Sequence, residues 1–327
     1  MKYDLFLGNQ HKVTKLINNS FKKNRLVHTY LFEGPRGTSK LEGAYYFAQK
    51  LLCTSTKETP CMECEDCKKV MDEVHPSIFY IEPVNDLITK EQVEKLEREF
   101  SLTPIGDGTR VYIIKDIDKA NLSAANSLLK FLEELEGNKY GILLTENLHS
   151  VLPTIRSRSV IVYFDTLPAT VVASELINKG VDPETSNVLS KITNSVNDSL
   201  NLINDGYILD LIEIVKKLSF AFVMKETSPV FVLLENEDKI IKMKEKKYHN
   251  LFMDLLITLA NDKLYYVLNQ LDKIVFKDTM GIIGLNIKSS YEEIVEEIET
   301  LLRFKERLKY NVNIELFYSQ LIIEMMR

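Results

Sequence analysis

The sequence predicts an α/β domain with a parallel sheet, followed by domains built only from helices. Two observations carry this prediction. Up to about residue 165, short apolar segments alternate with amphipathic helical segments, which is typical of a parallel sheet covered on both faces. Beyond residue 165 strand-like segments become scarce and helical periodicity continues to the end. At 327 residues the chain is too long for one ordinary core, so two or three domains are expected.

The first part of the chain contains the expected strands and the helices between them. The segments RVYIIK and GILLT are almost entirely apolar, as expected of strands that are buried on both faces. Thr89 precedes an acidic first turn and is the expected N-cap of its helix. Strands are expected over residues 29–33, 78–82, 110–115, 141–145 and 160–164. Helices are expected over residues 11–21, 41–52, 90–100 and 123–135.

The remainder reads as helices separated by turns. Three short helices are expected over residues 168–179, 183–193 and 198–204, and longer ones from about residue 210. We therefore predict three domains. They are an α/β domain over 1–165, a small helical domain over 166–207 and a helical bundle over 208–327.

Composition limits the function classes. The net charge of −6 argues against a protein that coats nucleic acid with its whole surface, although a local basic patch stays possible. The basic run KIIKMKEKK over 239–247 could touch DNA, but a solvated helix face is the simpler interpretation. No apolar run reaches the roughly 20 residues that a membrane-spanning helix needs. The N-terminal segment also lacks the order of a signal peptide. We expect a cytoplasmic protein that does not contact membranes.

The loop after the first strand is similar to a phosphate-binding P-loop, G-x-x-x-x-G-K-[ST]. The segment GPRGTSKL keeps Gly34 and Lys40 and has Gly37 inside the loop. Ser39 replaces the second glycine of the motif, which disfavours close approach of backbone N–H groups to a phosphate. Leu41 replaces the Ser or Thr whose hydroxyl binds Mg²⁺. A glycine-rich turn in another parallel sheet would explain the turn, but not the order of strand, loop, lysine and helix.

The acidic partner of a P-loop is also missing. An ATP-hydrolysing site needs Asp and then Glu after the strand RVYII, for Mg²⁺ and for the attacking water. This chain has Lys115 and then Asp116 there, and a cation at the metal-ligand position repels Mg²⁺. The departures point the same way, so we expect P-loop ancestry without ATP hydrolysis by this chain.

All four cysteines lie in one short segment. Cys53, Cys61, Cys64 and Cys67 follow the pattern C-x7-C-x2-C-x2-C, and four thiolates suit tetrahedral Zn²⁺. Such a site leaves no open coordination position, so we expect structural zinc. The alternative is four free thiols, which their clustering disfavours. His75 lies just outside and is expected to be a loop residue.

Several strings together resemble a known family. They are LGNQ at 7–10, LVHTYLFEGP at 26–35, AANSLLKFLEE at 124–134, PTIRSR at 153–158 and YNVN at 310–313. Along nearly its whole length the chain resembles the delta-prime family of subunits of the bacterial DNA polymerase III clamp loader. That family belongs to the AAA+ superfamily. The resemblance implies an AAA+ domain with a zinc knuckle, a helical lid domain and a helical collar domain that serves oligomerisation.

The resemblance also implies roles for single residues. Ser157-Arg158-Ser159 corresponds to the family's Ser-Arg-Cys motif, whose arginine reaches ATP on a neighbouring subunit. A surface arginine that caps a loop is the alternative. Thr145 lies at the position of the family's first sensor and is expected to be structural here. Asn197 replaces the arginine of the second sensor, and Asn194 can adopt the left-handed conformation that the family's glycine would supply.

The implied activity belongs to an assembly. The resemblance implies a ring with tau/gamma and delta subunits that places the beta clamp on primer–template DNA. The chain would then be no enzyme alone, but part of the DNA polymerase III holoenzyme. Two alternatives remain open: an active tau/gamma-type ATPase subunit, and a non-replicative AAA+-like zinc scaffold.

Overall fold

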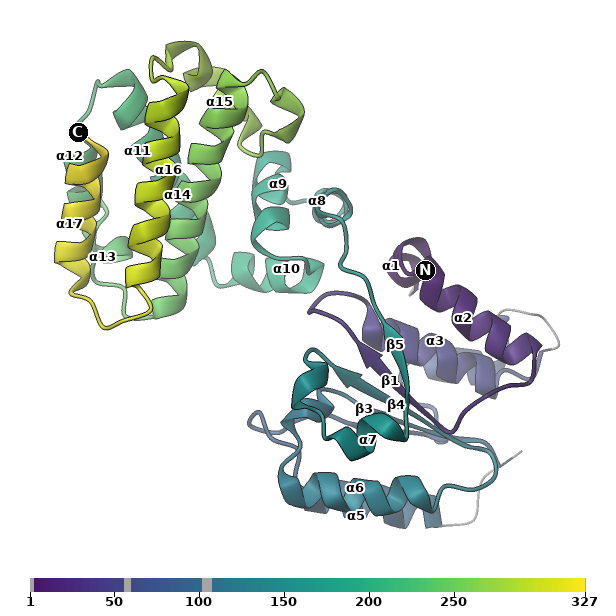
Figure 1. Ribbon diagram of the computed structural model, residues 1–327. Coiled ribbons are helices and arrows are strands. Elements are labelled where there is room, and N and C mark those ends of the chain that lie inside the picture. Colours follow the sequence, from purple (N-terminus) through teal and green to yellow (C-terminus); the bar gives the residue numbers. More distant parts are fainter. Residues whose placement is uncertain (1–2, 56–59, 102–107, 327) are drawn as a thin grey trace. The chain divides into compact units, whose positions relative to one another are not determined.

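The chain divides into two compact units, Met1–Leu167 and Pro168–Arg327 (Figure 1). The computed structural model describes residues 3–55, 60–101 and 108–326. The first unit holds the parallel sheet. The second unit consists of helices joined by turns and has no strand within its described residues. The further division of the helical part at residue 207 stays a prediction.

The sheet of the first unit is parallel and confirms the five expected strands. Its order is β2-β3-β4-β1-β5, so the loops after all five strands open at one edge. In this register Glu33, the last residue of β1, lies opposite Thr145 on β4 and Tyr163 on β5. The strands are β1 (Thr29–Glu33), β2 (Ile78–Ile81), β3 (Arg110–Ile114), β4 (Lys139–Thr145) and β5 (Val160–Tyr163).

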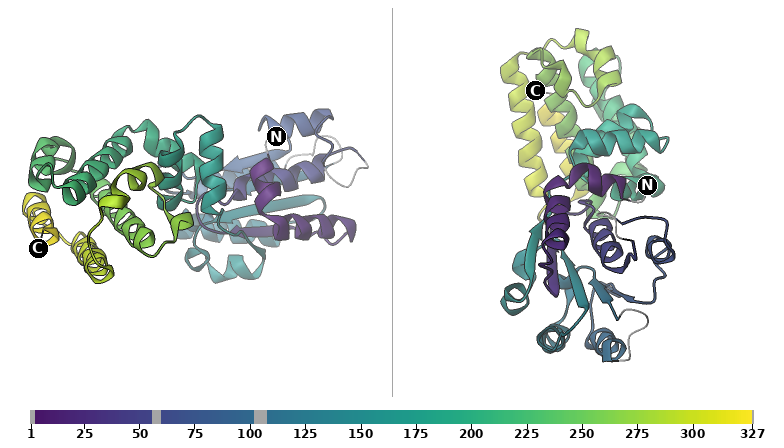
Figure 2. Two further views of the ribbon diagram at one scale, coloured as in Figure 1. Left: turned by 90° about the horizontal axis from the view of Figure 1, so that it is seen from above. Right: turned by 90° about the vertical axis from the view of Figure 1, so that its right-hand side faces the viewer.

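Helices cover both faces of this sheet, which explains its apolar strands (Figures 1 and 2). Side chains alternate along each strand, so Tyr30 and Phe32 pack into the core beneath α1 to α3, whereas Leu31 packs into the core beneath α5 and α6. The helices are α1 (Asp4–Asn9), α2 (His11–Lys22), α3 (Lys40–Leu52), α4 (Glu65–Met71), α5 (Lys90–Ser101), α6 (Leu122–Glu133) and α7 (Pro153–Ser157).

The helix predictions hold within one or two residues, and three short helices were not predicted. Thr89 lies directly before α5, and its backbone N–H donates to Oε1 of Gln92 at 3.0 Å, which is half of a capping box. The helices α1, α4 and α7 have five to seven residues each. That is less than two turns, too short for a helical period to show in the sequence.

The second unit packs helices around a long central one. α14 lies against α11 and α16, and the buried Asp262 on α14 accepts the backbone N–H groups of Val275 at 3.0 Å and Phe276 at 2.7 Å. The helices are α8 (Ala169–Asn178), α9 (Pro183–Ile192), α10 (Val196–Asn204), α11 (Tyr207–Met224), α12 (Pro229–Glu235), α13 (Glu237–Ile240), α14 (Lys246–Val267), α15 (Lys277–Ile283), α16 (Tyr291–Arg307) and α17 (Ile314–Met325).

The basic run over 239–247 corrects one interpretation from the sequence. It does not form a single helix face, because α13 ends at Ile240 and α14 begins only at Lys246. Two of its lysines pair with acids nearby, Lys239 with Asp210 at 2.6 Å and Lys242 with Asp238 at 2.9 Å. Within the described residues, no helix combines the length and the apolar character needed to cross a bilayer.

Candidate functional site

The loop between β1 and α3 keeps the backbone shape of a phosphate loop. The N–H of Gly34 donates to the carbonyl of Thr145 at 3.3 Å, and a Cβ at Gly34 would lie 2.7 Å from the carbonyl oxygen of Phe164. Gly37 has φ +77° and Ser39 has φ +60°, so both adopt conformations that favour glycine. The loop is therefore folded as the motif requires, although a serine occupies one glycine position.

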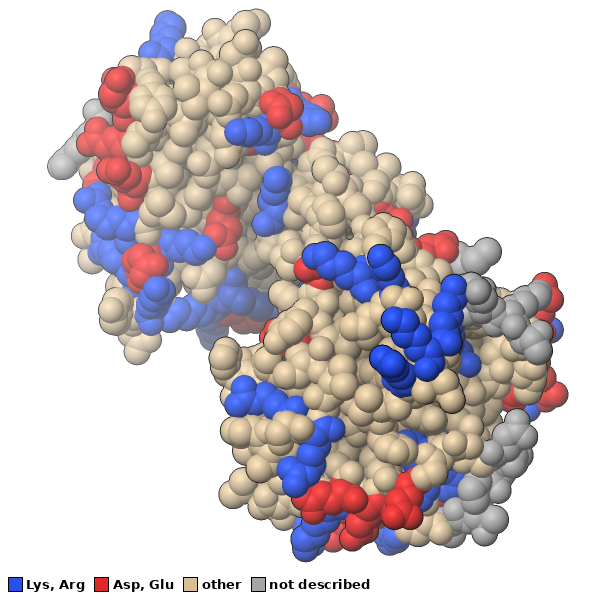
Figure 3. All heavy atoms as spheres, turned by 45° about the vertical axis from the view of Figure 1, so that its right-hand side comes forward, with Lys and Arg blue, Asp and Glu red and all other residues tan. Residues whose placement is uncertain are grey.

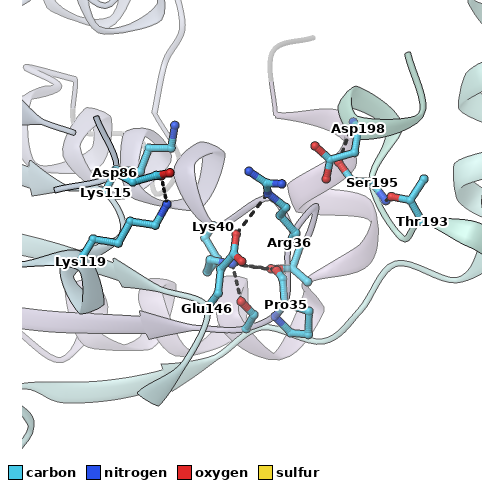
Figure 4. Close-up of polar contacts among 12 residues, drawn as sticks. Pro35, Arg36, Lys40, Asp86, Lys115, Lys119, Glu146, Thr193, Ser195 and Asp198 are labelled. Carbon is cyan, nitrogen blue, oxygen red and sulfur yellow. Dashed lines mark hydrogen bonds and ion pairs between the residues drawn. The ribbon is translucent and has the colours of Figure 1, made fainter. Parts of the chain in front are cut away.

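Lys40 points back into its own loop (Figure 4). Its Nζ donates to the carbonyl of Gly34, to the carbonyl of Pro35 at 2.7 Å and to Oγ1 of Thr38 at 3.5 Å. The side chain is buried, and burial lowers the pKa of Lys40 against the opposing effect of Glu146. All three ammonium protons thus have partners within the chain, and a phosphate would compete with them.

The two magnesium-ligand positions hold no oxygen ligand. Leu41, half-buried on α3, packs against the core beneath α1 to α3. Lys115 follows β3, and its Nζ lies 3.5 Å from a carboxylate oxygen of Glu82. Asp116 comes next with φ +51° and begins a 3-10 turn. An apolar side chain and a cation therefore occupy the two positions at which the P-loop motif predicts oxygen ligands for Mg²⁺.

Thr145 is committed to the structure around the end of β4. It is fully buried, its Oγ1 donates to Asp118 at 2.6 Å, and the same atom accepts the N–H of Asn147 at 3.1 Å. The hydroxyl of Thr145 therefore both donates and accepts a hydrogen bond within the protein. These contacts fix the loops after β3 and β4 to each other.

Gln10 is a member of this site that the motifs did not reveal. Its buried amide donates to the carbonyls of Thr38 at 3.2 Å and Asp165 at 2.7 Å, and it accepts the N–H of Asp165 at 3.1 Å. It thereby joins the α1–α2 junction to the phosphate loop and to the end of β5. The only sequence signal was its place in the string LGNQ, which says nothing of its contacts.

Arg158 lies on the surface at the C-terminal end of α7. Its guanidinium donates to the carbonyl of Thr154 at 3.2 Å and forms an ion pair with Glu133 at the end of α6, and the side chain is 40% exposed. Exposed ion pairs contribute only about 0–1 kcal/mol. The guanidinium is thus oriented by two contacts but is held weakly enough to exchange Glu133 for another anion.

The four cysteines come together as one cluster. Their sulfur atoms all lie within 4.8 Å of one another, and no disulfide joins them. The Sγ atoms of Cys53 and Cys61 are 3.6 Å apart, and those of Cys61 and Cys67 are 3.8 Å apart. A tetrahedron with Zn–S bonds of about 2.3 Å has edges of about 3.8 Å. The cluster is therefore compatible with a structural zinc site.

Backbone N–H groups orient the sulfur atoms of this cluster and change the pKa of at least one thiol. The N–H groups of Cys61, Cys64 and Cys67 donate to the sulfur atoms of Cys53, Cys61 and Cys64 at 3.4–3.5 Å. The backbone bonds to Cys61 lower its thiol pKa to about 6, which favours the thiolate that a metal needs. Burial instead raises the pKa of Cys67, and a bound cation would oppose this effect.

His75 is not part of the cysteine cluster. Its Nδ1 accepts the N–H of Ser77 at 3.1 Å, so Nε2 carries the proton and donates to Asp66 at 3.2 Å. Both ring nitrogens are used, and the side chain is buried. The histidine joins α4 to the start of β2.

The second-sensor segment lies in the second unit. Asn197 is exposed near the start of α10, which Ser195 caps by accepting the N–H of Asp198 at 3.2 Å. Asn194 does not adopt the left-handed conformation that is open to an asparagine, because it is not among the residues with positive φ. Ser195 caps the helix from an extended backbone conformation, so the turn needs no left-handed residue before it.

This chain is similar in sequence to known subunits of DNA polymerase III. Residues 9–168 match the family model described as "DNA polymerase III, delta subunit". DNA polymerase III subunit delta' of Bacillus subtilis is 31% identical over 325 residues, which cover 96% of this chain and 95% of that protein. Subunit delta' of Pseudomonas aeruginosa is 34% identical over 41% of this chain and 42% of its own. Subunit tau of Bacillus subtilis is 29% identical over 56% of this chain and 32% of its own.

Proposed function

Since this chain belongs to the delta' subunits of the DNA polymerase III clamp loader, we propose that it works there without hydrolysing ATP and supplies Arg158 to a neighbour's ATP site. Its own phosphate loop then serves as a rigid part of the assembly. The proposal therefore concerns two sites. One is a nucleotide site that does not hydrolyse ATP, and the other is the exposed guanidinium of Arg158.

The observation that carries the proposal is the pair Leu41 and Lys115. A Mg²⁺ ion needs oxygen ligands, and two unit charges 4 Å apart interact by about 1–4 kcal/mol at the dielectric constants of water and protein surfaces. Lys115 therefore disfavours the metal, and Leu41 cannot compensate. Lys40 is in addition occupied by the carbonyls of Gly34 and Pro35. Without a held metal, neither the γ-phosphate nor the attacking water is positioned.

Arg158 has the features that action in trans requires. Its planar guanidinium offers a fork of donors that fits phosphate oxygens. Thr154 and Glu133 orient it at the surface, and an incoming phosphate can replace the exposed carboxylate of Glu133. Such an arginine stabilises the charge of the transition state on the neighbouring nucleotide.

We further propose that the cysteine cluster binds one structural Zn²⁺ ion. Cys53, Cys61, Cys64 and Cys67 would each supply a thiolate, and the backbone N–H groups that point at the sulfur atoms would offset their negative charge. The ion would fasten the end of α3 to α4. This use of zinc adds stability and takes no part in phosphate chemistry.

The partners follow from the family. We propose that the chain assembles with tau/gamma and delta subunits, and that it meets the beta clamp and primer–template DNA within that assembly. Its relatives support the assembly with tau/gamma subunits, since tau and tau/gamma subunits are similar to part of this chain. The cytoplasmic location stays a prediction from the sequence.

An active tau/gamma-type ATPase is the competing proposal, because the chain also resembles tau. The residues at positions 39, 41 and 115 weigh against it. A non-replicative zinc scaffold is disfavoured by 31% identity to a delta' subunit along 96% of the chain.

Reconstitution with a tau/gamma subunit and delta tests the role of Arg158. Arg158→Ala should slow DNA-stimulated ATP hydrolysis at the receiving site by roughly 10³-fold, because one transition-state charge contact is lost. Arg158→Lys should recover little of it, because the fork geometry is lost. Glu133→Gln is the matched control, since it removes the partner and keeps the arginine.

Size-exclusion chromatography of each complex checks that the subunits stay together. Turnover that is unchanged by Arg158→Ala in an intact complex would remove this residue from the mechanism.

A further inference from the structure

The segment that contains α2 is strongly basic in an acidic protein. There is no Asp or Glu between Asp4 and Glu33, whereas this stretch carries Lys12, Lys15, Lys22, Lys23 and Arg25. The chain as a whole has a net charge of −6. The positive charge is therefore a local feature that neither the proposed nucleotide chemistry nor the cysteine cluster uses.

Four of these five side chains, those of Lys12, Lys15, Lys23 and Arg25, border one groove on the first unit. The groove has a volume of about 460 Å³ and runs along the outer face of α2. From position 12 to position 23 a helix rises by about 16 Å, long enough to follow two or three phosphates of one strand. Figure 3 shows Lys and Arg side chains gathered on this unit. We call the residues that line the groove the α2 groove: Lys12, Lys15, Leu16, Asn19, Ser20, Lys23 and Arg25.

Three of these five cations have no ion-pair partner among the described residues. Lys12 pairs with Asp165 at 3.1 Å, and both side chains are largely exposed. For Lys15, Lys23 and Arg25, no carboxylate of the described residues lies within ion-pair distance. All three side chains are exposed, so they can reach a ligand without rearrangement of the core.

Helix stability does not explain the arrangement. Cations near the C-terminal end of a helix interact favourably with its dipole, which accounts for Lys22, Lys23 and Arg25. The same interaction is unfavourable at the N-terminal end, where Lys12 lies in a first turn without acidic residues and Lys15 follows in the second turn. These two also repel each other at a spacing of three residues. The charge along the whole helix therefore indicates an anionic ligand.

We propose that the α2 groove binds the phosphate backbone of duplex DNA without reading its sequence. Lys15, Lys23 and Arg25 supply the cationic contacts, and the exposed amide of Asn19 supplies a neutral donor between them. Among the described residues, none that lines the groove is aromatic, so the groove lacks the stacking surface that single-stranded nucleic acid requires. The partner is thus recognised by its regularly spaced charges.

Fluorescence anisotropy of a labelled duplex with the full chain tests this proposal. The triple variant Lys15→Gln, Lys23→Gln and Arg25→Gln should bind at least about tenfold more weakly at 50 mM salt. The slope of log K against log salt should fall in magnitude by about 3, because each phosphate contact contributes about 0.9. The matched control replaces three exposed lysines of the second unit, Lys217→Gln, Lys277→Gln and Lys288→Gln, and should keep both values.

Three results would overturn the proposal. They are an unchanged salt slope in the α2 variant, an equal loss in the control variant, and tighter binding of a single strand or a polyglutamate peptide of matched charge than of the duplex. Arg158→Ala should leave duplex binding by the isolated chain intact, so the outcome is separate from that of the ATPase experiment.

Discussion

Ser39 shows how this loop keeps its shape after losing a glycine. It adopts φ +60° and ψ +27° at the start of α3, a conformation that costs a residue with a Cβ about 1–2 kcal/mol. The hydrogen bonds of Lys40 to Gly34 and Pro35 hold the loop around it. The fold therefore tolerates local strain in a loop that we propose no longer takes part in ATP hydrolysis.

Replacing Ser39 by glycine tests the backbone conformation of the loop separately from ATP hydrolysis. Ser39→Gly should raise the free energy of unfolding by roughly 0.5–1 kcal/mol, because relief of strain exceeds the added entropy of the unfolded chain. It should not restore ATP hydrolysis, because Leu41 and Lys115 remain. Urea denaturation and a phosphate-release assay measure the two effects.

A second serine provides the control for Ser39→Gly. Ser123, exposed in the first turn of α6, should lose up to about 1 kcal/mol on replacement by glycine, because there the backbone is an ordinary helix. If both replacements lower the free energy of unfolding, the claim that Ser39 is strained is contradicted.

Individual site residues differ in how far the sequence could predict them. Leu41 and Lys115 could be identified because a motif fixes which side chain each position needs. The conformation of Ser39, the inward turn of Lys40 and the bonds of Gln10 depend on contacts with distant segments, so no local pattern reveals them. Asn194 does not use the left-handed conformation for the same reason, since the neighbouring cap at Ser195 decides that turn.

At the scale of single elements, α4 depends on the cysteines. It has seven residues, begins after Cys64 as its N-cap, and is joined to β2 through His75 and to α3 through the cluster. So short a helix is marginal on its own. We infer that the proposed zinc ion, and not helix propensity, keeps α4 folded.

Removal of one cysteine tests this inference. The purified chain should contain about one zinc ion, and Cys64→Ser should abolish zinc binding and lower the melting temperature by at least about 5 °C, because metal binding is coupled to folding. Elemental analysis and thermal melting give the two readouts.

His75→Asn is the matched control, because His75 lies beside the cluster without contributing a ligand. It should keep its zinc while losing the contact with Asp66. Full zinc content in Cys64→Ser, or none in the unaltered chain, would contradict the assignment.

The elements themselves were largely predictable. The strands were found because both faces of the sheet are buried, so the segments over β3 and β4 are nearly all apolar. Long amphipathic helices such as α5 were found within a residue. The short helices α1, α4 and α7 were missed, because caps, cysteines and tertiary contacts define them more than a period does.

At the scale of the whole molecule, we propose that the first unit keeps the architecture of an ATP site without its chemistry. The first unit keeps the parallel sheet, the phosphate loop and the order of strand ends that an ATP site uses, and family membership agrees with that architecture. Its metal-ligand positions hold a leucine and a lysine. What the unit offers to a partner therefore lies on its surface, in Arg158 and, as we infer, in the α2 groove.

Steady-state turnover of Mg-ATP by the purified chain is the most direct test of the silent site. We predict no hydrolysis beyond the background that remains in a Lys40→Ala variant, because neither Leu41 nor Lys115 can hold the metal. Turnover that is robust in the unaltered chain and disappears in Lys40→Ala would contradict this account.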